Sequence, residues 1–310
     1  MATVIVHTAG LLTTVQDRGR YGYQRFGMPV SGAMDVFSLE LANLLMGNDP
    51  GDACLEATIS GPELEFTGAT WVAITGADMD PHLNGQGIPK NTSIDVRPGD
   101  RLGFRGLISG CRTYIAFAGG ISVPPVMGSR STYLRAGIGG FQGRALMPGD
   151  ELPLGEPVGK PRLKKIPEGL IPEYKHEQTI RIISGPEAHY FEIAGLRSFL
   201  SSEYMVTAQS DRMGYRLTGE TIKHKEGMTS IISAGISLGA VQVPGDGQPI
   251  ILMADRQTSG GYARIANVIA PDLTLIAQMR PEHKIHFKET TLVLAQHVYI
   301  SRQHSLLGLC

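Results

Sequence analysis

The chain has 310 residues, of which 42% are hydrophobic and only 18% are charged, and its formal net charge is -1. Because one hydrophobic core rarely organises so long a chain, two domains or two halves are expected. The near-neutral charge argues against nucleic acid or an anionic membrane as a partner, and no apolar run reaches the ~18 residues that a transmembrane helix needs.

The first half of the chain is predicted to form a strand, one helix and then a series of short strands. The first strand covers Thr3–Val6. After a polar loop comes a helix that Ser31 caps and Gly47 ends, because apolar residues recur at helical spacing over 34–45. Turn residues then separate five strand-like runs, as in an all-β barrel or sandwich. These runs cover residues 55–59, 71–75, 93–96, 101–104 and 112–117.

Residues 155–178 are the expected junction between the halves. This stretch has four prolines, no apolar periodicity and a basic cluster at Arg162, Lys164 and Lys165. A linker or a long surface crossing is therefore expected. The basic cluster should be solvated, because no aromatic residue interleaves it as in a nucleic-acid patch. The predicted division is an N-terminal half at 1–155, a crossing segment at 156–178 and a C-terminal half at 179–310.

The second half is predicted to return to short strands after one helix. That helix should start at Pro186 and present an apolar face over residues 190–196, and a second, short helix is expected at 272–279. The predicted strands cover residues 230–233, 240–243, 250–253 and 292–300. The chain as a whole is therefore expected to be mainly β, with a few short helices.

Two polar segments resemble each other. Residues 16–23 and residues 209–216 each carry Gln, Asp, Arg and a Gly-Tyr pair. Charged groups are rarely buried unless paired, so each segment is a poor core element and suggests a defined polar site in each half. The sequence ISGPE also occurs twice, at 59–63 and 183–187, but on opposite sides of these segments. The halves are thus related with altered order, or the matches are chance.

Several familiar catalytic patterns are missing. Residues 155–160 resemble the start of a Walker loop but have the wrong spacing and are followed by Pro161, so use of ATP would need another chain. The glycines of 137–143 suit a tight turn better than a dinucleotide fingerprint. A metal site is not expected, since His283 and His286 lie in a strand-like run without a nearby cysteine. No Gly-x-Ser-x-Gly nucleophile elbow occurs either.

The cysteines and the N-terminal sequence bear on the compartment. The three cysteines form no Cys-x-x-Cys pair, and the first residues lack the charged start and long apolar core of a signal peptide. Free thiols in a reducing cytoplasm are the simplest interpretation. The three are Cys54, Cys111 and Cys310.

Two further polar runs are candidate sites. Residues 128–135 combine hydroxyls with arginines, whose planar guanidinium suits carboxylate or phosphate, but such a loop can equally satisfy its own backbone. Residues 255–262 directly follow an apolar strand, a common place for a site. Asp255 with Arg256 could equally be a structural ion pair. The Asp-Arg neighbours in the two polar segments share this ambiguity.

Read together, these segments resemble the family of the 5-oxoprolinase C subunit (PxpC), also called KipA or allophanate hydrolase subunit 2. The matching runs lie along nearly the whole chain, with mild departures at Ser259 and at residues 281–283. The same module occurs in the carboxyltransferase part of biotin-dependent urea carboxylase. The runs are residues 12–20, 31–35, 41–44, 118–121, 123–132, 210–216 and 248–258.

The resemblance implies two cyclophilin-like β-barrel halves and a hydrolase that is active only in a complex. It implies an ATP-dependent 5-oxoprolinase, which opens 5-oxoproline to glutamate together with its A subunit and a KipI-like B subunit. ATP would be used by the complex, with no membrane or nucleic-acid partner. The polar segments should line one groove, at the barrel mouths or between the barrels.

The family's polar runs also imply site residues. Asp17, Asp211 and Asp255 are the candidate catalytic residues, which would orient arginines or handle protons. Ten candidates would bind substrate through donors to carboxylate or phosphoryl oxygens. They are Gln16, Arg18, Arg20, Arg130, Ser131, Thr132, Arg212, Tyr215, Arg256 and Gln257.

Two alternative functions stay open at the level of sequence. The first is carboxyl transfer from carboxybiotin, as in urea carboxylase, which would need a separate biotin carrier because this chain has no Met-Lys-Met motif. The second is a KipA-like regulator that binds a kinase inhibitor related to the B subunit.

Overall fold

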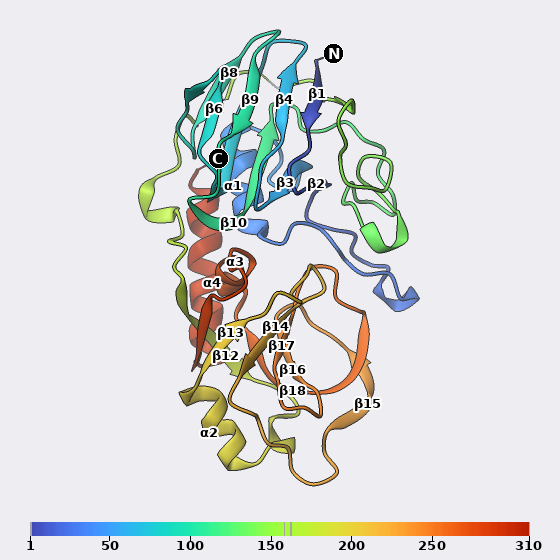
Figure 1. The fold of residues 1–310 in the computed structure, drawn as a ribbon, viewed down its shortest axis with the longest axis vertical. Coiled ribbons are helices and arrows are strands. Elements are labelled where there is room, and N and C mark those ends of the chain that lie inside the picture. Colours follow the sequence, from blue (N-terminus) through green and yellow to red (C-terminus); the bar gives the residue numbers. More distant parts are fainter. Residues whose placement is uncertain (1, 158, 162, 310) are drawn as a thin grey trace. The chain divides into compact units, whose positions relative to one another are not determined.

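A computed structural model describes residues 2–157, 159–161 and 163–309 (Figure 1). Strands hold 36% of the residues and helices 18%, which confirms a mainly β protein. Cys310 and Arg162, named above as a thiol and as part of the basic cluster, lie outside the described residues.

The described chain divides into two compact units that are not simply its two halves. Unit 1 contains the described residues of 1–21, 31–174 and 305–310. Unit 2 contains residues 22–30 and 175–304. The chain therefore passes from one unit to the other four times, at residues 21/22, 30/31, 174/175 and 304/305.

Unit 1 contains two open sheets. The larger has the order β11-β1-β4-β9-β6-β7, and the smaller has the order β2-β3-β10-β5-β8. The strands of the larger sheet are β1 (Thr3–Thr8), β4 (Glu63–Phe66), β6 (Pro81–Leu83), β7 (Gln86–Gly87), β9 (Arg101–Phe104) and β11 (Glu151–Pro153). Those of the smaller sheet are β2 (Leu12–Gln16), β3 (Cys54–Thr58), β5 (Thr70–Asp78), β8 (Ser93–Val96) and β10 (Ser109–Phe117).

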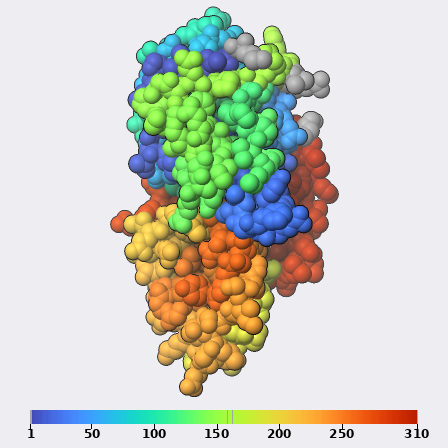
Figure 2. All heavy atoms as spheres, turned by 90° about the vertical axis from the view of Figure 1, so that its right-hand side faces the viewer, coloured from blue at the N-terminus to red at the C-terminus, as the bar shows by residue number. Residues whose placement is uncertain are grey.

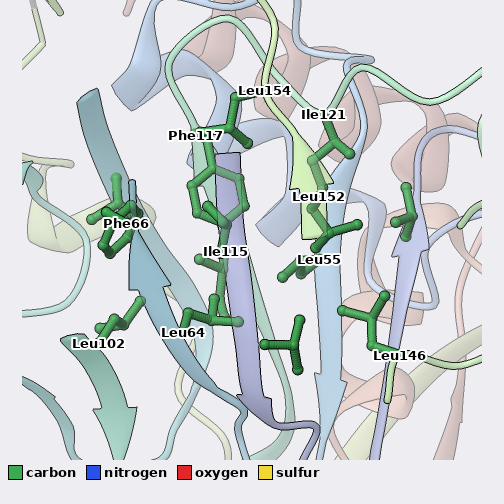
Figure 3. Packing of buried hydrophobic residues seen from close by; sticks show 14 of the residues in the cluster. Leu55, Leu64, Phe66, Leu102, Ile115, Phe117, Ile121, Leu146, Leu152 and Leu154 are labelled. Atoms are coloured by element: carbon green, nitrogen blue, oxygen red, sulfur yellow. The ribbon is translucent and has the colours of Figure 1, made fainter. Parts of the chain in front are cut away.

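Buried side chains of both sheets share one core. Alternate residues of β1 and β4 point inward, as the two-residue period of a strand requires. Leu64, Phe66 and Ile115 lie in this core and are fully buried (Figure 3). The core fixes the strand ends from which the polar loops of unit 1 emerge.

The predicted first helix is confirmed as α1 (Val36–Met46), although its cap differs. Asp35, not Ser31, caps it by accepting a hydrogen bond of 3.1 Å from the Ser38 N–H. Gly47 ends it in the left-handed conformation, with φ of 69°. Ser31 instead donates from its hydroxyl to the Thr132 carbonyl at 3.2 Å, so it belongs to the polar loops.

Unit 2 is built around a closed barrel of seven strands. The order β12-β19-β13-β14-β17-β16-β18 closes through pairing of β18 with β12, and β15 extends from β18. The expectation of a barrel in each half therefore differs from the observed pairing, since the described strands of unit 1 leave both sheets open. The strands are β12 (Glu177–Ser184), β13 (Glu203–Val206), β14 (Gly214–Gly219), β15 (Ser230–Gly235), β16 (Ala240–Val243), β17 (Ile250–Leu252), β18 (Ser259–Val268) and β19 (Lys284–Glu289).

The strand predicted at residues 292–300 is wrong. These residues begin the helix α4 (Leu292–Leu307). The run of apolar and β-branched residues suggested a strand, but its buried residues Ala295 and Leu306 follow helical spacing. Arg302, on the same side, donates to the Pro271 carbonyl at 2.6 Å, an anchor that only the folded structure supplies.

The remaining helices are short. The helix predicted from Pro186 begins later, as α2 (Ile193–Ser201), while the one predicted at 272–279 is confirmed as α3 (Leu273–Ala277). None of the helices in the described part of the chain combines the length and apolar character that crossing a bilayer requires. Single 3₁₀ turns occur at η1 (Gln24–Phe26), η2 (Leu134–Ala136), η3 (Glu168–Leu170), η4 (Ala188–Tyr190) and η5 (Ala270–Asp272).

The crossing segment before β12 is packed against unit 1 where it is described. The Ile166 N–H donates to the Asn91 carbonyl at 2.9 Å, and its side chain is fully buried. The long loop from residue 118 to 150, between β10 and β11, covers part of unit 1's surface as the green area of Figure 2. This loop carries the candidate residues Arg130, Ser131 and Thr132.

Candidate functional site

In unit 1, two of the candidate segments lie side by side although they are far apart in sequence. The end of β2 runs along residues 129–132, where the Thr132 N–H donates to the Val15 carbonyl at 2.9 Å. The Gln16 amide donates to the Thr132 carbonyl at 3.2 Å. Both side chains are fully buried. Gln16 and Thr132 therefore join the segments and are not presented to a ligand.

Asp17 is the centre of this junction. Its carboxylate accepts hydrogen bonds from the Gly19 N–H at 2.7 Å, the Arg130 N–H at 2.5 Å and the Ser129 hydroxyl at 2.7 Å. The Ser131 hydroxyl is a fourth donor. A carboxylate offers about four lone-pair positions. Asp17 therefore has its acceptor capacity filled by the loop that it shapes.

Arg130 is the candidate residue of this loop that remains partly exposed. Its backbone N–H is held by Asp17, and its Nε donates to the Val123 carbonyl at 2.9 Å. Among the described residues, the two terminal guanidinium nitrogens have no hydrogen-bond partner. They form a pair of fixed donors suited to a planar carboxylate.

Asp52 lies within the electrostatic reach of Arg130 and was not identified from the sequence. Burial raises the pKa of this half-buried carboxyl; Asp49 adds to the effect through its charge, while Arg130 opposes it. Residues 48–52 directly follow Gly47, which ends α1. The two aspartates that flank Pro50 and Gly51 could have indicated a polar site, but nothing in the sequence placed them near residue 130.

The other two arginines of the first polar segment have different surroundings. Arg18 forms an ion pair with Glu40 of α1, at 2.7 Å, and its side chain is 47% exposed. Arg20 is fully buried and donates to the Ser131 carbonyl. Arg18 could reach a ligand at the surface, whereas Arg20 stabilises the loop of residues 129–132 from the protein interior. Glu40 was also missed, because it lies within the helix pattern.

A buried network outside the predicted site supports the same junction. Glu56 of β3 accepts hydrogen bonds from the Tyr114 hydroxyl at 2.7 Å and from the Met34 N–H at 2.8 Å. Burial, followed by the charge of Glu56, raises the pKa of Tyr114 well above its usual value. The Tyr114 hydroxyl also accepts from the Asp35 N–H at 2.8 Å. The network fixes the turn before α1, whose Ala33 N–H binds the Asp17 carbonyl.

Unit 2 gathers its own candidate residues around an ion pair. Arg212 and Asp255 form two hydrogen bonds, of 2.9 and 3.2 Å, and their side chains are only 9% and 7% exposed. The Asp255 N–H also donates to the Arg212 carbonyl at 2.9 Å. The sequence left open an ion pair between Asp255 and Arg256, and the structure shows an ion pair between Asp255 and Arg212.

The other candidates of unit 2 serve mostly local structure. Asp211 accepts from the Met213 N–H at 2.8 Å, which closes its own turn. Arg256 donates from Nε to the Ile236 carbonyl at 3.2 Å. Tyr215 is buried and donates to the Met279 carbonyl at 3.1 Å. Gln257 is exposed.

The candidate residues therefore form two clusters, one in each unit. The unit 1 cluster follows strand β2, whereas the corresponding polar segment of unit 2 precedes strand β14. The first segment thus leaves the end of a strand, whereas the second leads into one. A single groove shared by both clusters stays a prediction.

Comparisons with known proteins identify the family of this chain. The family model described as "Carboxyltransferase domain, subdomain A and B" matches residues 26–289. The C subunit of 5-oxoprolinase from Escherichia coli is 41% identical over 92% of this chain and 90% of its own length. The corresponding protein of Haemophilus influenzae is 36% identical over 90% of this chain and 88% of its own length.

One structural relative is a larger protein. The crystal structure of the Kluyveromyces lactis urea carboxylase matches 99% of this chain with a TM-score of 0.94 and 32% identity. The present chain covers only 29% of that protein. By sequence, the present chain belongs to the family of carboxyltransferase domains with subdomains A and B.

Proposed function

We propose that this chain is the C subunit of an ATP-dependent 5-oxoprolinase, which opens 5-oxoproline to glutamate together with its A subunit and a KipI-like B subunit. The proposal is supported by 41% identity to a 5-oxoprolinase C subunit over nearly the full length of both chains. We further propose that it works in the cytoplasm, in keeping with the free, buried thiol of Cys54.

The observation that carries the proposal is the fixed guanidinium of Arg130. 5-Oxoproline is a small cyclic amide that bears a carboxylate. Two adjacent N–H donors on a planar group are the usual recognition element for a carboxylate. Because Asp17 and Val123 hold Arg130 by its backbone and its Nε, the donors are oriented before a ligand arrives.

The aspartates of the site act mainly as positioning residues in this proposal. Asp17 orients the loop that carries Arg130, and Asp255 orients Arg212 through their two hydrogen bonds. Asp52 is an additional candidate for proton transfer, since burial favours its neutral form. Arg18, half-exposed beside Glu40, is the second candidate for contact with an anionic group.

ATP is proposed to bind to a partner protein within the complex. The described residues of this chain form no phosphate-binding loop. Gly155 begins the sequence that partly resembles one. Its N–H donates to the Gly120 carbonyl at 3.0 Å, and a Cβ at this position would meet the Gly119 carbonyl. This backbone is closed by its own chain and does not form an open cradle. ATP binding is therefore assigned to one of the partner proteins.

The test is reconstitution with a matched pair of variants. The complete complex, supplied with ATP and 5-oxoproline, should release glutamate, and omission of this chain should abolish the reaction. Arg130→Gln should raise KM for 5-oxoproline by about 10- to 100-fold. This increase corresponds to the loss of ~1.5–3 kcal/mol of binding free energy that hydrogen bonds to a charged group contribute. Arg97→Gln, at an exposed arginine of unit 1, should leave KM unchanged. Glutamate release without this chain would refute the assignment.

Carboxyl transfer from carboxybiotin is the second candidate, favoured by the TM-score of 0.94 with a urea carboxylase. Biotin would come on a separate carrier. A purified carboxybiotin carrier should then lose its carboxyl group to an amide substrate only when this chain is present. Under the KipA-like regulatory alternative, Arg130→Gln would leave partner binding and its effect intact.

A further inference from the structure

Three side chains on the outer face of the unit 2 barrel converge on one point. They are Glu177 of β12, His286 of β19 and Glu203 of β13, three strands that are neighbours in the sheet. Glu203 lies directly opposite His286 in the antiparallel pair. Thr179 lies opposite His286 in the parallel pair, and Glu177, two residues earlier, projects from the same face.

The polar atoms of the three residues lie close together, and the shortest distance is that of an ion pair. His286 Nε2 lies 2.9 Å from Glu177 Oε1 and 3.6 Å from Glu203 Oε2. One ligand atom from each residue lies within 4.8 Å of both others. Ligands bound at 2.0–2.2 Å around one tetrahedral zinc ion are separated by roughly 3.3–3.6 Å. Small side-chain rotations would therefore bring all three atoms onto one ion.

We propose that Glu177, Glu203 and His286 form a binding site for a divalent transition-metal ion of the zinc class. One imidazole and two carboxylates are ligands that zinc accepts, and the imidazole nitrogen disfavours calcium and magnesium, which prefer oxygen. Because the strand register presets the three positions, binding costs little ordering of the backbone. Water would complete the coordination.

Lys284 fits the site as a neighbour of one ligand. Its Nζ lies 2.9 Å from Glu203 Oε1, while Glu203 Oε2 is the oxygen that faces His286. The lysine thus holds the carboxylate by its outer oxygen and leaves the inner oxygen for the metal. Outer partners of this kind commonly orient metal-binding carboxylates. The lysine charge also weakens cation binding, so an affinity in the micromolar range is expected.

The site would be structural and is independent of the proposed 5-oxoprolinase activity. A metal here would fasten three adjacent strands of the barrel. No sequence motif indicates it, because Glu177 and His286 are 109 residues apart. This is why a metal was not expected from the spacing of histidines.

The test is calorimetric titration of the full, metal-free chain with zinc chloride. One equivalent should bind, and His286→Ala should weaken that binding at least tenfold, as should Glu203→Gln. His297→Ala, at an exposed histidine of α4, should leave it unchanged. Zinc should raise Tm of the wild-type chain and of His297→Ala but not of His286→Ala.

Cobalt supplies a second measurement that does not depend on stability. Cobalt bound by nitrogen and oxygen ligands in a four- or five-coordinate site gives visible absorption that is stronger than that of the hydrated ion. This band should appear at one equivalent and disappear in Glu177→Gln. Zinc binding that survives unweakened in a folded His286→Ala variant, or no saturable binding at 100 µM zinc, would overturn the proposal.

Discussion

Asp17 organises the unit 1 cluster through hydrogen bonds from two hydroxyls and two backbone N–H groups. These four donors hold the carboxylate in one position within the loop. Its value to the protein lies in the fixed position of Arg130. The sequence predicted Asp17 as a member of a polar site, but three of its four partners lie more than 100 residues away, so its role could not be read from spacing.

Replacement of Asp17 should therefore cost stability as well as activity. Asp17→Asn replaces one acceptor oxygen with an NH2 group. This NH2 group would face a hydrogen-bond donor of the loop, so one hydrogen bond would be lost. We expect a loss of about 1.5–3 kcal/mol in the free energy of unfolding. Urea denaturation measures it, with Asp95→Asn, an exposed residue of β8, as the control. Equal stability of the two variants would contradict the role assigned to Asp17.

His283 gives the protein a pH dependence that can be isolated. Its side chain is 7% exposed; burial lowers its pKa to about 4, and the charges of Arg280 and His176 add to the effect. An unfolded histidine binds its proton near pH 6.5, so the unfolded state gains protons first as pH falls. The contribution of His283 to stability should be complete above pH ~6.5 and be lost progressively down to pH ~4.

The measurement compares urea midpoints of the wild-type chain and His283→Gln at about pH 7 and about pH 5, with a chelator present. The wild type should lose more stability over this interval than the variant. Parallel behaviour of the two proteins would show that His283 does not titrate as described.

At the scale of elements, glycines let the loop beneath Arg130 pack closely. Gly139 has φ of 69°, and a Cβ there would lie 2.1 Å from the Ser131 carbonyl oxygen and 2.6 Å from an Arg20 nitrogen. The element that carries the candidate residues is therefore supported by direct backbone contact. A side chain at this position would push against the same segment that Asp17 holds.

Two glycine variants separate this contact from backbone strain. Gly137 has a similar φ of 64° but almost open space around its missing Cβ. Gly137→Ala should cost only the left-handed conformation, about 1–2 kcal/mol. Gly139→Ala should cost roughly 1–3 kcal/mol more, the usual range for overpacking, and should raise KM in the reconstituted assay. Equal costs by denaturation would rule out the packing argument.

Sequence patterns predicted elements well where short-range signals agreed. The strands at 93–96, 101–104 and 240–243 are found as predicted, since turn residues bound them closely. Helix α4 was misread because its β-branched residues favour a strand. The barrel closure between β12 and β18 could not be foreseen, because pairing of distant strands leaves no local signature.

At the scale of the whole molecule, α4 connects the two units in sequence. Its residues up to 304 belong to unit 2, and residues from 305 belong to unit 1. Leu306 is 7% exposed and packs in the core that contains Phe37 and Leu41, next to helix α1. The last residues of the chain therefore complete the hydrophobic core of the first unit.

Adjacent leucines of α4 test this role. Leu306→Ala should lower the free energy of unfolding by about 2–5 kcal/mol, as for buried leucines elsewhere. Leu307→Ala should have an effect within about 0.5 kcal/mol, because Leu307 is 68% exposed. Both substitutions make the same change in helix propensity, so thermal or urea denaturation reports packing alone. A neutral Leu306→Ala would remove α4 from the unit 1 core.

The exchange of segments between the units also constrains how the protein can fold during synthesis. The core around α1, which contains Phe37 and Leu41, cannot be buried completely until Leu306 has left the ribosome. Most residues of that core lie before residue 174. Translation at about 5–20 residues per second makes the nascent N-terminal part wait on the order of ten seconds. Throughout that interval apolar surface of α1 stays uncovered at one edge. Newly made chains should therefore be captured by chaperones that recognise exposed apolar segments, and release should coincide with the emergence of α4.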